Sequence, residues 1–115
     1  MKKTQPYIGN ITDNIYSYQN KINDDNNKNI FNQIILYINS GNIGEINNFL
    51  NKPNFNINYK DPNTGDSYLH IIINTDNKII DENQKLYLIE LFVSKNININ
   101  LKNKLNETPL LLSIN

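Results

Sequence analysis

The chain has 115 residues, enough for one domain, and its formal net charge is zero because eleven lysines balance eleven acidic residues. A net charge of zero does not favour binding to nucleic acid or to an anionic membrane. The absence of arginine argues further against recognition of phosphate groups. The absence of cysteine excludes disulfides, thiolate zinc sites and cysteine nucleophiles.

The apolar runs are far shorter than the roughly 20 residues of a membrane span. Two lysines near the N-terminus are not followed by an apolar stretch, which is unlike a secretory signal. We therefore expect a cytoplasmic protein. Asparagine, isoleucine and lysine dominate while alanine, arginine and tryptophan are missing, a composition typical of AT-rich genomes such as those of large DNA viruses, protozoa or intracellular bacteria.

Residues 1–28 form an asparagine-rich lead-in. Four of its apolar residues share one helical stripe: Ile11, Ile15, Tyr18 and Ile22. Two interpretations remain open. The segment is either a short helix that caps the apolar edge of the following elements, or a disordered stretch that ends at residues 24–27.

Residues 29–60 predict two helices and an extended link. The first helix covers Asn29–Asn39 and ends at Ser40-Gly41-Asn42; the second covers Ile43–Lys52 and is stopped by Pro53. In the link, residues 54–60, apolar and polar positions alternate, which predicts one inward face.

Residues 61–102 repeat this plan behind a turn. Asp61–Gly65 has the residues of a turn, and Asp66 or Ser67 is suited to cap a helix over Ser67–Thr75. After a polar loop, a helix over Gln84–Lys95 is apolar nearly all round, so we expect it to be the most buried helix. Residues 96–101 form the next link.

Residues 103–115 begin the plan a third time. Asn106 occupies the position of Gly65, and asparagine is the next best residue for a left-handed backbone. The expected helix after Thr108 has no second helix behind it, which leaves four apolar residues uncovered: Leu110, Leu111, Leu112 and Ile114. We expect either a longer parent chain or docking of this end onto another chain.

The two turn-and-helix segments resemble the ankyrin repeat over about residues 29–115. Thr108-Pro109-Leu110 and Leu69-His70 match its signature, and an Asn-Ile-Asn precedes each turn. Tyr68 replaces the family's proline, and Ile72 stands where a small residue is usual. The resemblance implies an all-α, ankyrin-like helix-pair solenoid of about two and a half units: residues 29–60, 61–102 and a partial unit 103–115.

The resemblance also implies a non-enzymatic protein-binding module without cofactors, one that engages regulatory proteins, or host proteins in the host cytoplasm if the source is a virus or an intracellular bacterium. Such modules bind through the turn tips and the exposed side of each first helix. These positions are Asn39, Lys60, Pro62, Asn63, Thr64, Asp66, Asn74, Thr75, Lys102, Lys104 and Glu107. Two other functions stay open: a scaffold segment that self-associates through its C-terminal helix, and an enzyme that uses its single histidine.

His70 has no obvious catalytic partner, because Ser67 is the expected helix cap. We expect its ring to be hydrogen-bonded to neighbouring turn backbone. The acidic residues do not have the spacing of a calcium-binding loop, so no metal site is predicted.

Overall fold

The computed structural model describes the backbone of residues 4–114 and, within that range, the side chains of Ile15 and residues 17–114. Its elements are α1 (Thr4–Asn39), the 3-10 helix η1 (Ile43–Glu45), α2 (Asn47–Leu50), α3 (Tyr68–Asn74), α4 (Glu82–Ser94) and α5 (Pro109–Ser113). Residues 4–114 contain no strand, so the predicted all-α class is confirmed.

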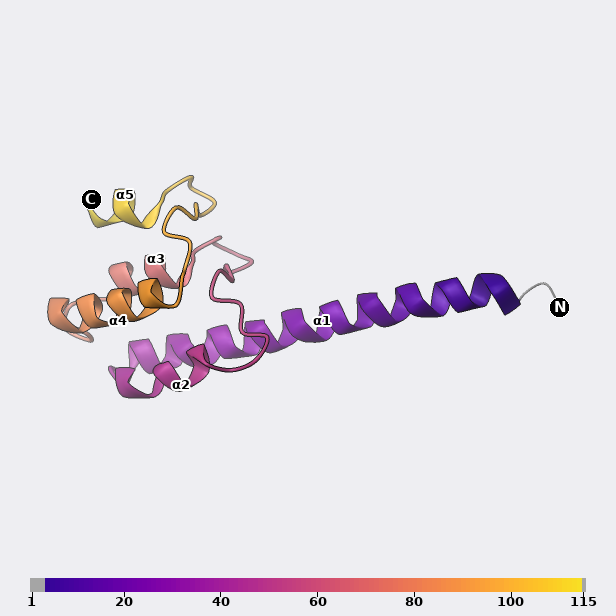
Figure 1. Cartoon of the computed structure of the whole chain (residues 1–115). Helices are drawn as coiled ribbons and strands as arrows, with labels where there is room; N and C mark the ends of the chain where they lie inside the picture. Colours follow the sequence, from indigo (N-terminus) through magenta and orange to yellow (C-terminus); the bar gives the residue numbers. More distant parts are fainter. Residues whose placement is uncertain (1–3, 115) are drawn as a thin grey trace.

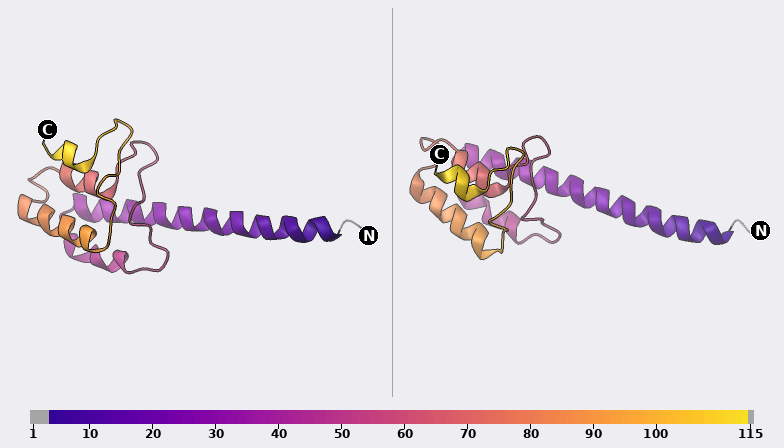
Figure 2. Two further views of the ribbon diagram at one scale, coloured as in Figure 1. Left: turned by 45° about the horizontal axis from the view of Figure 1, so that its top comes forward. Right: turned by 90° about the horizontal axis from the view of Figure 1, so that it is seen from above.

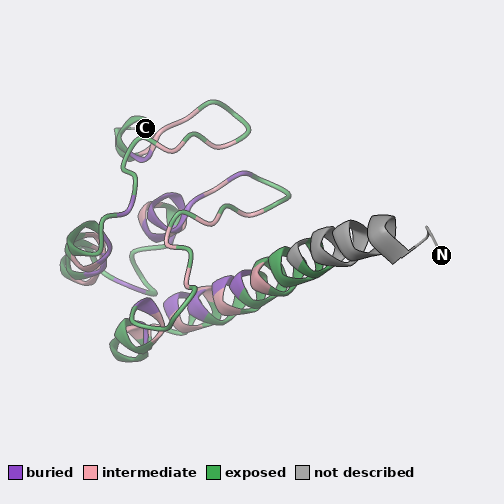
Figure 3. Cartoon of the chain, turned by 45° about the vertical axis from the view of Figure 1, so that its right-hand side comes forward, coloured by how far each residue is buried: buried purple, intermediate pink, exposed green. Residues whose placement is uncertain are grey.

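The short helices form a body at one end of α1, and the rest of α1 extends from it as a single rod (Figures 1 and 2). The end of α1 with η1 and α2 is one layer of this body, α3 with α4 is the next, and α5 lies beyond them. α3 is central because it contacts both α4 and α5. Two long loops, residues 51–67 and 95–108, leave the layers on the same side and lie one above the other (Figure 3).

α1 packs on the body through one face of its C-terminal part. The buried side chains on this face are Asn27, Phe31, Ile34 and Ile38, at the spacing of one side of a helix. The helix then ends at Gly41, which has a positive φ of 76°. The N–H groups of Gly41 and Asn42 donate to the carbonyl oxygens of Ile38 and Tyr37 at 3.1 and 2.9 Å. This end is where the sequence predicted it.

The lead-in is helical from Thr4, as one interpretation of residues 1–28 predicted, but the helix is neither short nor a cap. From Thr4 onward it is part of α1, and the helix continues through residues 24–27 without a break. Ile15, Tyr18 and Ile22 are 51%, 67% and 40% exposed, so this stripe does not cap the body. The helix runs straight out of the body instead of folding over its edge. Residues 1–3 and the side chain of Ile11, the fourth member of the predicted stripe, lie outside the described residues.

The helix predicted over Ile43–Lys52 is wrong in extent. The structure has the three-residue η1 and the four-residue α2 in its place. Gly44 and the asparagines in this stretch are poor helix formers, and Pro53 follows closely. Ile46 and Leu50 in this stretch are nevertheless buried.

The expectation that the helix over Gln84–Lys95 is the most buried is also wrong. α4 buries only Leu88 and Phe92, whereas Leu86, Tyr87 and Val93 are 54%, 48% and 45% exposed. The most buried helix is α3, since it lies between neighbouring layers. Its buried residues are Tyr68, Leu69, His70 and Ile72.

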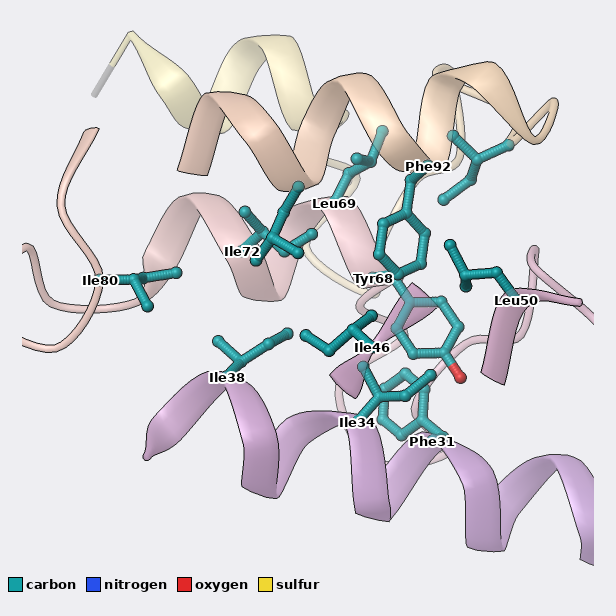
Figure 4. Packing of buried hydrophobic residues seen from close by; sticks show 12 residues of the cluster. Phe31, Ile34, Ile38, Ile46, Leu50, Tyr68, Leu69, Ile72, Ile80 and Phe92 are labelled. Atoms are coloured by element: carbon teal, nitrogen blue, oxygen red, sulfur yellow. The ribbon is translucent and has the colours of Figure 1, made fainter. Parts of the chain in front are cut away.

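Aromatic rings connect the layers through Tyr68 (Figure 4). The ring centroids of Phe31 and Phe92 lie 4.9 and 5.1 Å from that of Tyr68. The ring centroid of Phe55 lies 5.9 Å from it. The Tyr68 hydroxyl is buried and has no hydrogen-bond partner among the described residues. Burial, and to a smaller extent the neighbouring Tyr59, raises the pKa of Tyr68 far above its ordinary value. Tyr68 is therefore a core residue that keeps its proton.

Candidate functional site

The turn before α3 is closed by its own backbone and side chains. The N–H of Asp61 donates to the carbonyl oxygen of Asp66 at 2.9 Å, and the N–H of Gly65 donates to the carbonyl oxygen of Asp61 at 2.7 Å. The Asp61 carboxylate accepts the N–H of Asn63 at 2.7 Å. Gly65 has a φ of 74°, as the turn residues predicted.

The turn before α5 reproduces this arrangement with different residues. The N–H of Asn103 donates to the carbonyl oxygen of Glu107 at 3.0 Å, and the side-chain oxygen of Asn103 accepts the N–H of Leu105 at 3.1 Å. Asn106 has a φ of 64°. The equivalence of Asn106 and Gly65, predicted from the sequence, is confirmed by their shared left-handed conformation.

The two turns are in direct contact with each other. The N–H of Lys104 donates to the carbonyl oxygen of Thr64 at 2.9 Å. The side-chain amide of Asn103 donates to the carboxylates of Asp66 and Glu107, at 3.0 Å in each case. These bonds hold the second turn directly above the first.

His70 links α3 to the second turn. It is fully buried, and the N–H of Ser67 donates to its Nδ1 at 3.0 Å. Since Nδ1 accepts, the ring proton resides on Nε2, which donates to the carbonyl oxygen of Glu107 at 2.8 Å. Both ring nitrogens are thus engaged with backbone, which confirms the predicted structural role of His70.

Asparagine side chains connect the loops in a way that sequence reasoning missed. The Asn27 side chain donates to the carbonyl oxygen of Asn54 at 3.0 Å and accepts the N–H of Asn56 at 2.7 Å. Further along, the side-chain oxygen of Asn58 accepts the N–H of Asn98 at 2.8 Å. The recurrence of Asn-Ile-Asn before each turn was the sequence feature that could have predicted these bonds. We call these residues the asparagine ladder: Asn27, Asn56, Asn58, Asn98 and Asn100.

A depression of about 300 Å³, here called the groove, lies where the end of α1 meets α3. Its lining residues are Asn39, Asp66, Ile71, Asn74, Thr75, Asp76 and Ile79. The structure therefore brings together Asn39, Asp66 and Asn74 from the predicted binding surface. Asp76 and the two isoleucines were not predicted, because Asp76 reads as a loop residue and isoleucine as core.

Thr75 was predicted as part of the exposed binding surface, and this prediction is wrong. It is only 9% exposed, and its hydroxyl donates to the carbonyl oxygen of Ile71 at 2.7 Å. Its position at the end of α3 turns the side chain back onto the helix, so the hydroxyl is not free for a partner.

The remaining predicted residues lie on the two turns instead of in the groove. The exposed ones are Lys60, Pro62, Asn63, Thr64, Lys102 and Lys104. Glu107 is half-buried, and its carboxylate is held by Asn103. The predicted surface is thus divided between the groove and the turn tips.

Another depression, of about 540 Å³, was not predicted. It lies beside α4 and is lined by residues that include Ile73, Leu86 and Ser113. Lys85 crosses it, because its ammonium donates to the carbonyl oxygen of Ile73 at 3.1 Å.

Among the described side chains, those of Ile15 and residues 17–114, no cluster of three or more His, Asp or Glu has the arrangement of a metal site. No helix within residues 4–114 is both long enough and apolar enough to cross a bilayer. Comparisons with family models, curated proteins and solved structures found no match for the chain. The groove and the two turns are therefore the features of the molecule that bear on its function.

Proposed function

We propose that the chain is a non-enzymatic protein-binding module of the ankyrin-repeat type, acting in the cytoplasm of its source or host. Its units are the end of α1 with η1 and α2, then α3 with α4, and then α5. The partner lies across the groove and the tips of the two turns. This assignment rests on the stacking of equivalent parts and not on any single motif.

The observation that carries the proposal is the hydrogen bond from Lys104 N–H to the carbonyl oxygen of Thr64. It joins two turns that are built in the same way. Each turn precedes a helix, α3 or α5, and these two helices also contact each other. Stacked units of this kind bury a continuous core and present their turns and first helices on one side. A surface made this way is suited to binding another chain.

The chemistry of the groove favours a partner segment with hydrogen-bond donors. Asp66 and Asp76 contribute carboxylates, and Asn39 and Asn74 contribute exposed amides. A lysine, an arginine or an amide-rich segment would satisfy these acceptors. The groove has no arginine or aromatic anchor of the kind that dominates tight interfaces, so we expect modest affinity from this surface.

A displayed peptide library selected on the wild-type chain tests the proposal. We expect the selected binders to lose about tenfold or more in affinity, roughly 1.4 kcal/mol, on Asn39→Arg and on Asn74→Arg. Asn47→Arg adds the same charge on α2, outside the groove, and should leave binding unchanged. The proposal would be contradicted if the selected peptides bound both groove variants with the affinity they have for the wild-type chain.

A second candidate function is self-association through the C-terminal helix. Leu110, Leu111 and Ile114 are 74%, 45% and 72% exposed, whereas Leu112 is half-buried. Exposed apolar residues in such proximity are typical of an interface. Leu110→Lys and Ile114→Lys should lower a concentration-dependent mass in sedimentation if this face joins copies of the chain. An unchanged mass would exclude it.

A further inference from the structure

The N-terminal part of α1 is a helix without a neighbour in the described structure. The first described side chain that α1 buries is Asn27, and residues 24–26 lie near Pro53 and Tyr59, so the stretch that extends beyond the body runs from Thr4 to Asn23. At about 1.5 Å per residue it accounts for roughly 30 Å of the molecule's longest dimension, which is 67 Å. Figure 2 shows this stretch projecting from the body in both views.

The sequence of this stretch is a poor one for an isolated helix. It contains Gly9, several asparagines and β-branched residues, all of which have lower helix propensity than alanine. In proteins most of the stability of a helix comes from packing of one face and not from its intrinsic propensity. A covering partner along one face would supply the stability that the residues themselves do not.

One apolar stripe follows the stretch, and its spacing is that of a coiled coil. Ile15, Tyr18 and Ile22 are separated by three and then four residues and are all exposed. In the sequence the same alternation extends back to Ile11 and Ile8. Alternating steps of three and four residues produce a narrow seam suited to one partner helix. Asp25, the next position in the series, ends the stripe before the body begins.

The stripe lies on the far side of α1 from the body. At about 100° per residue, the mean direction of Ile15, Tyr18 and Ile22 is roughly 150° around the helix from that of the buried face. That face consists of Asn27, Phe31, Ile34 and Ile38. A helix packed along the stripe would therefore meet no obstruction from the body of the same molecule.

We infer that the stripe of α1 binds the same stripe of a second copy of the chain, in a parallel coiled coil with the two bodies directed outward. Identical stripes are complementary in register, since each isoleucine meets an isoleucine and Tyr18 meets Tyr18. The flanking residues bring no like charges together, because Asn14 would face Gln19 and Lys21 would face Asn26 of the other copy. The seam ends at Ile22, because two Asp25 carboxylates would meet at the next seam position. The assembly carries two grooves, which raises its avidity for a repeated partner.

Sedimentation of the whole chain from micromolar to near-millimolar concentration tests the inference. We expect the mass to rise from 13.4 kDa to at least twice that value. Ile15→Asp and Ile22→Asp should prevent the rise and reduce the helical circular dichroism signal. Asn20→Asp places the same charge on the opposite side of α1, at an exposed position, and should change neither measurement.

Two results would overturn the inference. One is a wild-type chain that stays monomeric throughout the concentration range. The other is association that persists in both Ile15→Asp and Ile22→Asp. If Leu110→Asp then abolishes the association, the C-terminal helix joins the copies instead of the stripe. Both isoleucines lie outside the core, so the body of each variant remains folded, and the near-ultraviolet signal of the Tyr68 cluster reports this independently.

Discussion

Gly65 lies so close to Lys104 that a Cβ added to the glycine would be 2.8 Å from the lysine backbone nitrogen. The same glycine has a φ of 74°, in the left-handed region. Two separate requirements, the turn conformation and the close approach of the next turn, therefore select glycine at this position.

Gly65→Ala should lower the free energy of unfolding by about 2–4 kcal/mol, because a left-handed alanine costs roughly 1–2 kcal/mol and overpacking costs about as much again. Urea denaturation measures this change. Gly44→Ala is the matched control, since a Cβ there meets no atom within 4 Å and its φ is not in the left-handed region. Equal effects of the two substitutions would contradict the stacking of the turns.

His70 should be a neutral imidazole with its proton on Nε2. The N–H of Ser67 occupies Nδ1, and the carbonyl oxygen of Glu107 accepts from Nε2. Nitrogen NMR of the ring distinguishes the tautomers directly, and a proton on Nδ1 would contradict the assignment. His70→Ala should also destabilise the chain by about 2–4 kcal/mol, since it leaves buried backbone groups unpaired and creates a cavity.

Tyr68→Phe should stabilise the chain or leave its stability unchanged, with a gain of up to about 1–3 kcal/mol, because it removes a buried hydroxyl that has no partner. The ring contacts with Phe31 and Phe92 remain in the variant. Thermal or urea unfolding measures the difference. A loss of more than about 1 kcal/mol would mean that the hydroxyl is hydrogen-bonded in the folded chain.

Tyr68 should also make the fold sensitive to alkali. Burial raises the pKa of Tyr68 above its ordinary value of 10.0, so above that pH the unfolded chain loses a proton that the folded chain retains. Stability contributed by the protonated form is therefore present below pH 10.0 and is lost as pH rises further. Unfolding curves from neutral to alkaline pH should show a smaller loss for Tyr68→Phe. Identical losses would place the alkaline sensitivity elsewhere.

Asn27→Ala should cost about 1–3 kcal/mol relative to Asn26→Ala in urea unfolding. Asn27 is buried and bonds both Asn54 and Asn56, whereas Asn26 is exposed on the same helix. Both substitutions gain the helix propensity of alanine, so the difference isolates the buried amide. Indistinguishable variants would show that the asparagine ladder contributes nothing to stability.

Local chemistry made much of this fold predictable from the sequence. The positive φ of Gly65 and Asn106, the capping role of Ser67 and the end of α1 at Gly41 each follow from the preferences of a few adjacent residues. The partly buried alternation of Phe55, Ile57 and Tyr59 was equally predictable, because period-two patterning needs no knowledge of the neighbours.

The sequence-based predictions were wrong where burial and helix length depend on contacts with other parts of the chain. α4 is apolar on several faces, yet burial depends on which faces are covered, and Leu86 and Val93 are not. The straight continuation of α1 through residues 24–27 was missed because asparagine and aspartate usually favour caps and turns. In the groove, Asp76 was missed because it reads as a loop residue, and the sequence does not show that Asn39 lies near it.

Stacking of the two turns is the central claim, and it is tested most directly by a scalar coupling measured across a hydrogen bond by NMR. The predicted result is a coupling between the Lys104 amide and the Thr64 carbonyl carbon, together with slow solvent exchange of that amide. A Lys104 amide that exchanges as freely as one in a solvated loop, with no coupling to Thr64, would contradict it.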